Sequence, residues 1–440
     1  MSTTLLVNAT LLPCDDAMSV VEGGWVEVRD DVVQGLGAGP PPDRPGAAVM
    51  DVGGDIVMPG MVNPHCHMAM TLFRGLGEDV DDRLFRYVLP LERRLVTPEM
   101  VRVGTRLAVL ELIEGGVTTV ADMYYFETEV GRVVDEAGLR GVVGQTLADF
   151  DPPDHRTMDE GFALVEALAA EFAGHPRVTA SIAPHAPYST DVPVLARVAA
   201  WAEEHPGVPV QIHLAEMDSE MAWCAERHGL RPVQLVRKAG LLRRGLICAH
   251  CLHVDAHDIA CMAEAGATVA HNARSNAKAG RGIAPVEAMR RAGIPVGIAT
   301  DGPMSGNTLD LLAQFGPVTM LQKLAGHSRK PMPCVEVVRM ATREGARVLG
   351  LEARIGSLEP GKQADLVRID LSSARVQPVY DVYATLVYAS LASDVRDVMV
   401  AGRWLMRDRT VLTLERKKVL RDAGQIAAAF RAEMTRIDAG

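Results

Sequence analysis

Histidine and acidic side chains stand at the ends of several apolar runs, in a pattern that suits metal-assisted hydrolysis. The first run ends in His65 and His67, and residues two apart in a strand point to the same face. Three later runs end in His213, His250 and Asp301. Imidazoles with one carboxylate suit a divalent first-row metal, most commonly zinc, with one position open for water. For a His-x-His pair alone, two surface histidines in a loop are the alternative.

A second acid follows one of these histidines. Glu216 lies three residues after His213, in the sequence HLAE. A carboxylate beside a metal-bound water can take its proton and pass it to a substrate. An acid in the first turn of a helix produces the same local pattern, and Asp301 in TDG could be a turn residue. The neighbouring candidate metal ligands favour the catalytic interpretation of both acids.

The apolar runs that carry these residues alternate with helix-like stretches such as VRVGTRLAVLELIEGG. There are eight runs, at residues 55–67, 118–125, 139–147, 177–185, 208–216, 245–253, 267–276 and 295–302. This alternation predicts an α/β fold, a parallel (β/α)8 TIM-type barrel. A doubly wound open sheet is the alternative. It would place a ligand at one switch point, whereas polar residues here follow nearly every run, as in barrel enzymes.

The two ends of the chain have a different residue pattern, with short strand-like runs and few helix-like stretches. Residues 1–57 hold short β-type runs separated by turns, and similar runs return at 355–370 and 394–412. Chain termini often lie close together in a domain. We therefore predict a small β-sandwich domain from residues 1–57 and 356–440, which includes a C-terminal helix, beside a barrel over residues 58–355.

The composition is that of an ordinary globular protein, with 440 residues, a formal charge of −11 and 48% hydrophobic residues. An acidic chain without a dense Lys/Arg run argues against binding to nucleic acid or anionic membranes. The seven cysteines are scattered, which is typical of reduced thiols in a cytosolic protein. The first residues lack the basic region of a signal peptide, and no run reaches the roughly 18 apolar residues of a membrane span. We expect a soluble, cytoplasmic protein.

Taken in order, the motifs around these residues resemble the amidohydrolase superfamily. They are MPGMVNPHCHMAMTLFRG, GVTTVADMYY, APHAPYS, VQIHLAE, AHCLH, AHNARSN, TDGPMSGN and GSLEPGKQADLV. The chain is similar to the aminohydrolase branch, which holds S-adenosylhomocysteine and methylthioadenosine deaminases, guanine deaminases and triazine chlorohydrolases. This resemblance covers nearly the whole chain. It implies a hydrolytic deaminase that acts on C–N bonds of cyclic amidines in small heterocycles and assembles as a homo-oligomer.

The resemblance also implies roles for the polar residues. One divalent metal per chain, Zn²⁺ or alternatively Fe²⁺, would be bound by His65, His67, His213 and Asp301. Two-metal members need a carboxylated lysine after the fourth strand, where this sequence has SIAPHAPY. Glu216 would protonate the ring nitrogen beside the attacked carbon. Asp301 would accept a proton from the water, and His250 would hydrogen-bond the attacking oxygen and the tetrahedral centre.

The long segment between the first and second runs is expected to cap the substrate pocket, because residues 68–117 exceed an ordinary βα loop. RGLGED and LPLE within it are similar to the adenosylhomocysteine deaminases. That similarity implies that Glu92 faces the ribose hydroxyls and that His185 hydrogen-bonds the purine. A solvated helical acid and a loop histidine are the alternatives.

The same segment departs from that subgroup. Arg83 lies where many of those deaminases have Trp, and Gln145 aligns with an Arg that they use near the homocysteine carboxylate, while Arg156 matches a second one. The predicted substrate-binding residues are Glu92, His185, Gln145, Arg156, Arg83 and Ser305. Because the departures concern the substrate tail, the expected substrate is a 5′-substituted adenosine: S-adenosylhomocysteine, methylthioadenosine, 5′-deoxyadenosine or adenosine. The alternatives are a deaminase of another aminopurine, a pterin or a pyrimidine, a triazine-type chlorohydrolase or aminohydrolase, and a catalytically dead barrel.

Overall fold

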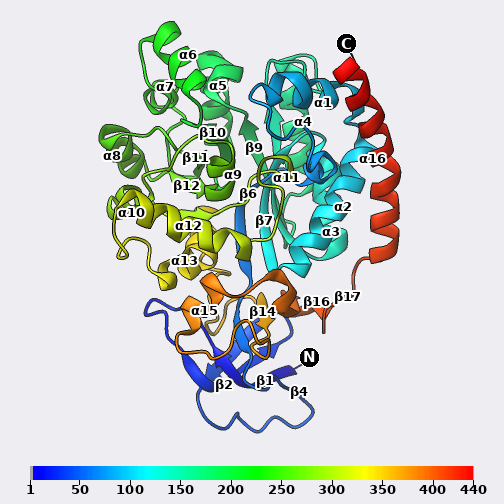
Figure 1. The fold of residues 1–440 in the computed structure, drawn as a ribbon, viewed down its shortest axis with the longest axis vertical. Helices are drawn as coiled ribbons and strands as arrows, with labels where there is room; N and C mark the ends of the chain where they lie inside the picture. The colour runs from blue at the N-terminus through cyan, green and yellow to red at the C-terminus, as the bar shows by residue number, and fades with distance from the viewer. Residues whose placement is uncertain (1–2, 440) are drawn as a thin grey trace.

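The computed structural model describes residues 3–439 and contains two sheets (Figure 1). The larger is an eight-stranded parallel sheet in the order β13-β12-β11-β10-β9-β8-β7-β6. Its strands are β6 (Met61–Cys66), β7 (Val117–Tyr124), β8 (Arg140–Leu147), β9 (Val178–Pro184), β10 (Val210–Leu214), β11 (Leu246–His250), β12 (Thr268–His271) and β13 (Val296–Ile298). Every predicted run coincides with one of them, although β7 begins one residue before its run. The predicted barrel is therefore confirmed.

Helices cover the outside of this barrel, and its strands are buried on their inner faces as well, as in β7 and β8, where every residue is buried. The helices are α2 (Pro98–Glu114), α3 (Glu127–Ala137), α4 (Met158–Glu171), α5 (Pro187–Glu204), α6 (Asp218–His228), α7 (Pro232–Lys238), α8 (Ala256–Ala265), α9 (Ala273–Lys278), α10 (Val286–Arg291), α11 (Pro303–Gly306), α12 (Leu312–Ala325), α13 (Cys334–Ala341) and α14 (Arg343–Val348). Capping boxes fix where two of these helices begin: Thr157 caps the N-terminus of α4, and Asp255 caps that of α8. None of the helices within residues 3–439 is long and apolar enough to cross a membrane.

Side chains and one backbone contact join the first and last barrel strands. Asn63 in β6 donates from Nδ2 to Thr300 Oγ1 at 2.8 Å, and its Oδ1 accepts from the Thr300 backbone at 3.2 Å. The backbone N–H of Asp301 donates to the carbonyl of His65 at 3.2 Å. These contacts place the first strand of the barrel beside the end of the last one, and so bring His65 next to Asp301.

The second sheet is mostly antiparallel and combines both ends of the chain, as expected. Its strands are β1 (Thr3–Leu11), β2 (Val21–Arg29), β3 (Val32–Gly37), β4 (Ala48–Asp51), β5 (Ile56–Pro59), β14 (Leu366–Ile369), β15 (Val395–Val400), β16 (Arg403–Arg407) and β17 (Thr410–Val411). The strand β5 connects the two halves, because it pairs with β1 on one side and β14 on the other. This sheet has its own apolar cluster.

The predicted run at 55–67 is two strands rather than one. It divides at Gly60, where the chain passes from the small sheet (β5) into the barrel (β6). A side chain does not fit at this crossing, because a Cβ on Gly60 would lie 2.1 Å from the side chain of Thr118. The strand of the small sheet thus extends through Pro59, beyond the predicted boundary at residue 58.

The cap and the C-terminal helix lie together on one side of the barrel. The cap contains a 3-10 helix η1 (Met68–Phe73), a π-helix η2 (Leu84–Val88) and α1 (Leu89–Leu95). The last helix, α16 (Arg416–Ala439), runs beside α2 and the cap, away from the small sheet (Figure 1). The rings of Phe430 and Phe73 meet there at 4.8 Å, and Tyr87 donates to Asp438 at 2.6 Å. Two short helices, α15 (Val382–Tyr388) and η3 (Ala392–Asp394), complete the chain.

Candidate active site

The four predicted metal ligands converge at the carboxyl ends of the barrel strands. His67 Nε2 lies 3.3 Å from His213 Nε2 and 3.4 Å from Asp301 Oδ1. His65 Nε2 lies 3.9 Å from the same Asp301 oxygen. His65, His213 and Asp301 are buried and His67 is nearly so. Residues from β6, β10 and the end of β13 therefore meet at the face where barrel enzymes place their sites.

The second nitrogen of two of these rings is occupied. His67 Nδ1 donates to the carbonyl of Met123 at 2.6 Å, and His213 Nδ1 donates to the carbonyl of His185 at 2.8 Å. A carbonyl can only accept, so Nδ1 carries the proton and the Nε2 lone pairs face each other. His65 Nε2 is buried without a hydrogen-bond partner among the described residues. This set of unprotonated nitrogens beside a carboxylate fits a divalent cation.

The electrostatics of the cluster favour the forms that bind metal. Burial, together with the neighbouring histidines, lowers the pKa of His65 well below its usual value and that of His213 to about 4. Burial works against the charge of Asp301, but His250, His67 and His65 outweigh it and hold the pKa of Asp301 well below its usual range. At neutral pH His65 and His213 are therefore neutral and Asp301 is ionised, as metal binding requires.

Glu216 and His250 lie beside this cluster. Oε1 of Glu216 is 3.6 Å from His250 Nε2, and His250 Nδ1 is fixed by Asn276 Oδ1 at 2.8 Å. Burial acts to raise the pKa of Glu216, yet His250 and an ion pair with Arg281 hold it below its usual value. Ser275 also donates to Asp301 Oδ2 at 2.5 Å.

Three of these contacting residues were missed by the reasoning from sequence. Ser275 and Asn276 lie within the AHNARSN motif, so their signal was present, but no pattern connected them with Asp301 or His250. Arg281 lies in a glycine-containing loop after α9, and nothing in the neighbouring sequence indicates that its side chain pairs with Glu216.

The backbone at the strand ends adopts left-handed conformations that non-glycine residues rarely adopt. The φ angle is +51° at Ala215, +73° at His250 and +60° at Asp301. Each such residue costs about 1–3 kcal/mol and persists only where surrounding contacts enforce it. Glu220 supplies one such contact, because its carboxylate accepts the backbone N–H groups of Ala215 at 2.9 Å and Glu216 at 2.8 Å. These three positions lie at or just after the ends of β10, β11 and β13.

Two of the predicted substrate-binding residues adjoin the cluster. The ring of His185 lies 4.9 Å from that of His213, and its Nδ1 is 2.9 Å from Ser189 Oγ. Glu92 in α1 is buried and accepts a hydrogen bond from Tyr124 at 2.8 Å. Burial raises the pKa of Glu92 to about 7, although that hydrogen bond opposes the shift. The Tyr124 ring in turn is 6.4 Å from that of His67, so Glu92 and Tyr124 connect the cap to one of the predicted metal ligands.

The other four predicted substrate residues have different surroundings. Gln145 is buried, and its Nε2 donates to Asp154 at 2.8 Å, while the Arg156 side chain is exposed. Arg83 donates to the carbonyl of Met304 at 2.9 Å and thereby fastens the cap to α11, where Ser305 is half-buried. Their part in substrate binding stays a prediction.

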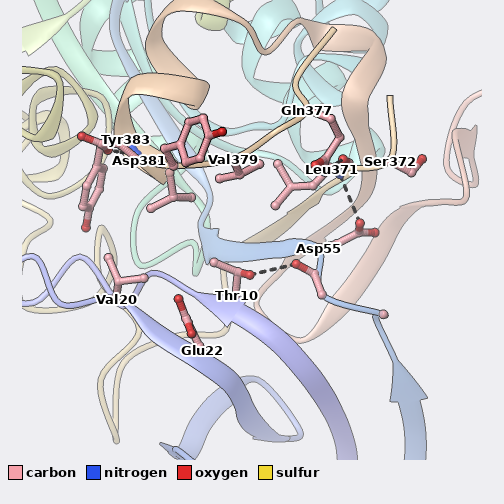
Figure 2. Close-up of a pocket in the computed structure, with 14 residues that line it drawn as sticks. Thr10, Val20, Glu22, Asp55, Leu371, Ser372, Gln377, Val379, Asp381 and Tyr383 are labelled. Carbon is pink, nitrogen blue, oxygen red and sulfur yellow. Dashed lines mark hydrogen bonds between the residues drawn. The ribbon is translucent and has the colours of Figure 1, made fainter. Parts of the chain in front are cut away.

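A cleft of about 760 Å³ lies elsewhere, between the small sheet and residues 371–383 (Figure 2). Two of the three carboxylates that line it, Asp55 and Asp381, have structural partners. Asp55 pairs with Arg368 at 2.6 Å and accepts the backbone N–H of Leu371, and Asp381 caps α15. No histidine lines this cleft. The chemistry-bearing residues are therefore in the barrel mouth.

Comparisons with known proteins agree with this geometry. The chain matches the Amidohydrolase family over residues 56–405. It is 37% identical to a 5-methylthioadenosine/S-adenosylhomocysteine deaminase of Syntrophus aciditrophicus, over 98% of each chain. A zinc-bound structure of an adenosine deaminase from Xanthomonas campestris superposes with a TM-score of 0.95 at 31% identity, over 98% of this chain and 99% of that one.

A more distant structure shares the fold. Atrazine chlorohydrolase from Arthrobacter aurescens, complexed with zinc, superposes with a TM-score of 0.88 at 21% identity, over 96% of this chain and all of that one. Because the family match covers most of the chain and the relatives are similar along their whole length, this protein belongs to the amidohydrolase family.

Proposed function

We propose that this protein is a metal-dependent hydrolytic deaminase that converts a 5′-substituted adenosine to the corresponding inosine and releases ammonia. The observation that carries the proposal is the convergence of the three imidazoles of His65, His67 and His213 with the carboxylate of Asp301, beside a second acid, Glu216. The deaminase names of relatives similar over nearly the whole chain support it.

The metal would be held by His65, His67, His213 and Asp301, and zinc is the metal that fits best. A divalent metal lowers the pKa of a bound water to about 7 and so supplies hydroxide at neutral pH. Zinc in two related structures supports this choice, as does the set of nitrogen ligands with one carboxylate.

The chain's own acids and His250 would move the protons. Attack at the amino-bearing carbon places negative charge on the adjacent ring nitrogen. Glu216 takes a proton from the water and gives it to that nitrogen, and general acid–base steps of this kind contribute roughly 100- to 10,000-fold. The protonated ring of His250, whose Nδ1–H donates to Asn276 Oδ1, would donate from Nε2 to the attacking oxygen. Asp301 would take the second proton of the water and pass it to the amino group, so that the C–N bond breaks and ammonia leaves the tetrahedral carbon.

The nucleoside would lie between the cluster and the cap. Glu92 would accept hydrogen bonds from the ribose hydroxyls, and His185 would hydrogen-bond the purine. The position of His185 beside His213, and the path from Glu92 through Tyr124 to His67, support this orientation.

The test is ammonia release by metal-loaded protein from adenosine, 5′-deoxyadenosine, methylthioadenosine, S-adenosylhomocysteine, guanine, cytosine, pterins and aminotriazines. We expect turnover with the adenosines. Glu216→Gln should lose at least about 100-fold in kcat and keep its metal, measured by elemental analysis. Turnover confined to the other heterocycles would overturn the assigned substrate. An active Glu216→Gln variant would overturn the assigned acid.

A further inference from the structure

Arg281 extends over the active site from the turn that follows α9. One terminal nitrogen of its guanidinium donates to Oε1 of Glu216. Gly280 and Gly282 flank it with φ angles of +65° and +111°, and a Cβ at either glycine would meet no atom within 4 Å. The turn therefore projects into open space, and within residues 3–439 the side chain of Arg281 makes its hydrogen bond to Glu216.

The two oxygens of Glu216 have different surroundings. Oε1 lies between Arg281 and His250 Nε2, which is 3.6 Å away. No residue among those described donates a hydrogen bond to Oε2. A carboxylate that accepts and returns a proton needs one oxygen free for the transfer. Arg281 thus fixes the carboxylate by the oxygen that the transfer does not need.

We propose that Arg281 is a positioning residue for Glu216, which holds one carboxylate oxygen so that the other can carry a proton between water and substrate. This inference rests on the proposed deaminase function. Glu216 has several rotatable bonds, and its free rotation would place Oε2 in a productive orientation for only part of the time.

Charge supports the same role. The charged and titratable groups near Glu216 are His250 of β11, His213 of β10, Asp301 after β13 and Arg281, together with Tyr188 of α5 and Glu220 of α6. Asp301 acts to raise the pKa of Glu216, whereas His250, Arg281 and His213 lower it. Of these, Arg281 is the group that keeps its positive charge at every working pH. It therefore keeps Glu216 ionised and able to accept the proton of the water.

A purely structural role does not fit the surroundings of Arg281. Its side chain is 32% exposed, so its removal leaves no cavity in the core. Its backbone N–H donates to the Asn276 carbonyl at 3.0 Å, a bond that any non-proline residue at this position can make. Substitution should leave the fold intact and change only the behaviour of Glu216.

The test compares Arg281→Met, Arg281→Lys and wild type by steady-state ammonia release on the best substrate. We expect Arg281→Met to lower kcat about 10- to 100-fold with KM within about twofold, and Arg281→Lys to recover most of the loss. Because Arg281 lowers the pKa of Glu216, the acidic limb of the kcat profile should move to higher pH in Arg281→Met. Lys278→Met is the matched control, since that cation pairs with Glu78, and its kcat should not change.

An unchanged kcat in Arg281→Met overturns the proposal, as does a loss confined to KM, which would mean that Arg281 contacts substrate. A loss that Lys does not recover, with an unchanged pH profile, also overturns it. If wild type is inactive on adenosines but active on another heterocycle, the proposed substrate fails and the same variants test Arg281 on that heterocycle. Inactivity of metal-loaded wild type on the whole panel would overturn both.

Discussion

At the scale of single residues, Glu92 connects the cap to the predicted active site through Tyr124. It is 6% exposed and holds the hydroxyl of Tyr124, a residue at the end of β7. Burial favours the neutral form of a carboxyl, which is why the pKa of Glu92 rises to about 7 instead of staying near its usual value. Glu92 therefore changes charge within the range in which the enzyme is expected to work.

This titration predicts a pH-dependent KM. Below about pH 7 Glu92 keeps its proton, and above it the carboxylate is ionised. Hydrogen bonds to an ionised acceptor are roughly twice as strong, so KM for an adenosine substrate should fall as pH rises through 7. Initial rates at graded pH measure this, and Glu92→Gln should remove that dependence. The same slope in both proteins would exclude Glu92 from the ribose site.

At the scale of elements, the contact between α2 and η1 positions the chain just after His67. Gly104 in α2 permits this contact, because a Cβ there would lie 2.4 Å from the backbone oxygen of Ala69. Thr71 adds a hydrogen bond from its hydroxyl to the Gly104 carbonyl at 2.7 Å. The atom that such a Cβ would meet belongs to the backbone, which cannot move aside as a flexible side chain can. If Gly104 is replaced, α2 and η1 must therefore move apart.

We predict opposite effects for two glycine-to-alanine substitutions in helices. Gly104→Ala should lower the free energy of unfolding by about 1–3 kcal/mol, since it overpacks the α2–η1 contact. Gly424→Ala in α16 should raise it by about 0.5–1 kcal/mol, because the position is exposed, meets no atom within 4 Å and gains helix propensity. Urea unfolding of both variants tests this. Equal stabilities would mean that α2 and η1 adjust freely.

At the scale of the whole molecule, a buried ion pair joins the two sheets at the end of the barrel away from the site. Arg140, the first residue of β8, donates from Nε to Asp365 at 3.1 Å, and both side chains are 2% exposed. Asp365 precedes β14 and also accepts the backbone N–H of Ala401 at 2.7 Å. The pair links the barrel to the sheet made from the chain ends.

Removal of one partner should therefore destabilise the molecule without changing its chemistry. Arg140→Ala leaves the Asp365 carboxylate buried without its cation, and we expect a loss of about 3–5 kcal/mol in unfolding free energy. The kcat of the folded fraction should stay at the wild-type value. Arg140→Met with Asp365→Leu should recover much of the stability. Chemical denaturation with activity at low denaturant measures both, and an equally unstable double variant would contradict the account.

Within the described residues, the C-terminal helix packs against the barrel side of the molecule and not against the small sheet. The helix α16, predicted to belong with the small sheet, lies along α2 and the cap, where Phe430 contacts Phe73. The predicted domain bounds, the homo-oligomer and the cytoplasmic location stay predictions.

The sequence by itself determined the barrel and most of the residues at its mouth. Parallel strands covered on both faces appear as apolar runs, and each run ends where polar side chains such as His213 and His250 begin. Both the alternation of strands with helices and the polar residues at the strand ends are patterns of neighbouring positions, so they can be recognised in a single sequence.

Only the tertiary structure decided which groups meet. The break of one run at Gly60, the ion pair of Arg281 with Glu216 and the bond of Asn276 to His250 were not predicted. These features join residues that are 26 to 65 positions apart, or depend on a close approach such as Gly60 to Thr118. Local patterns do not encode such contacts, because they arise only when neighbouring strands bring their loops to one end of the barrel.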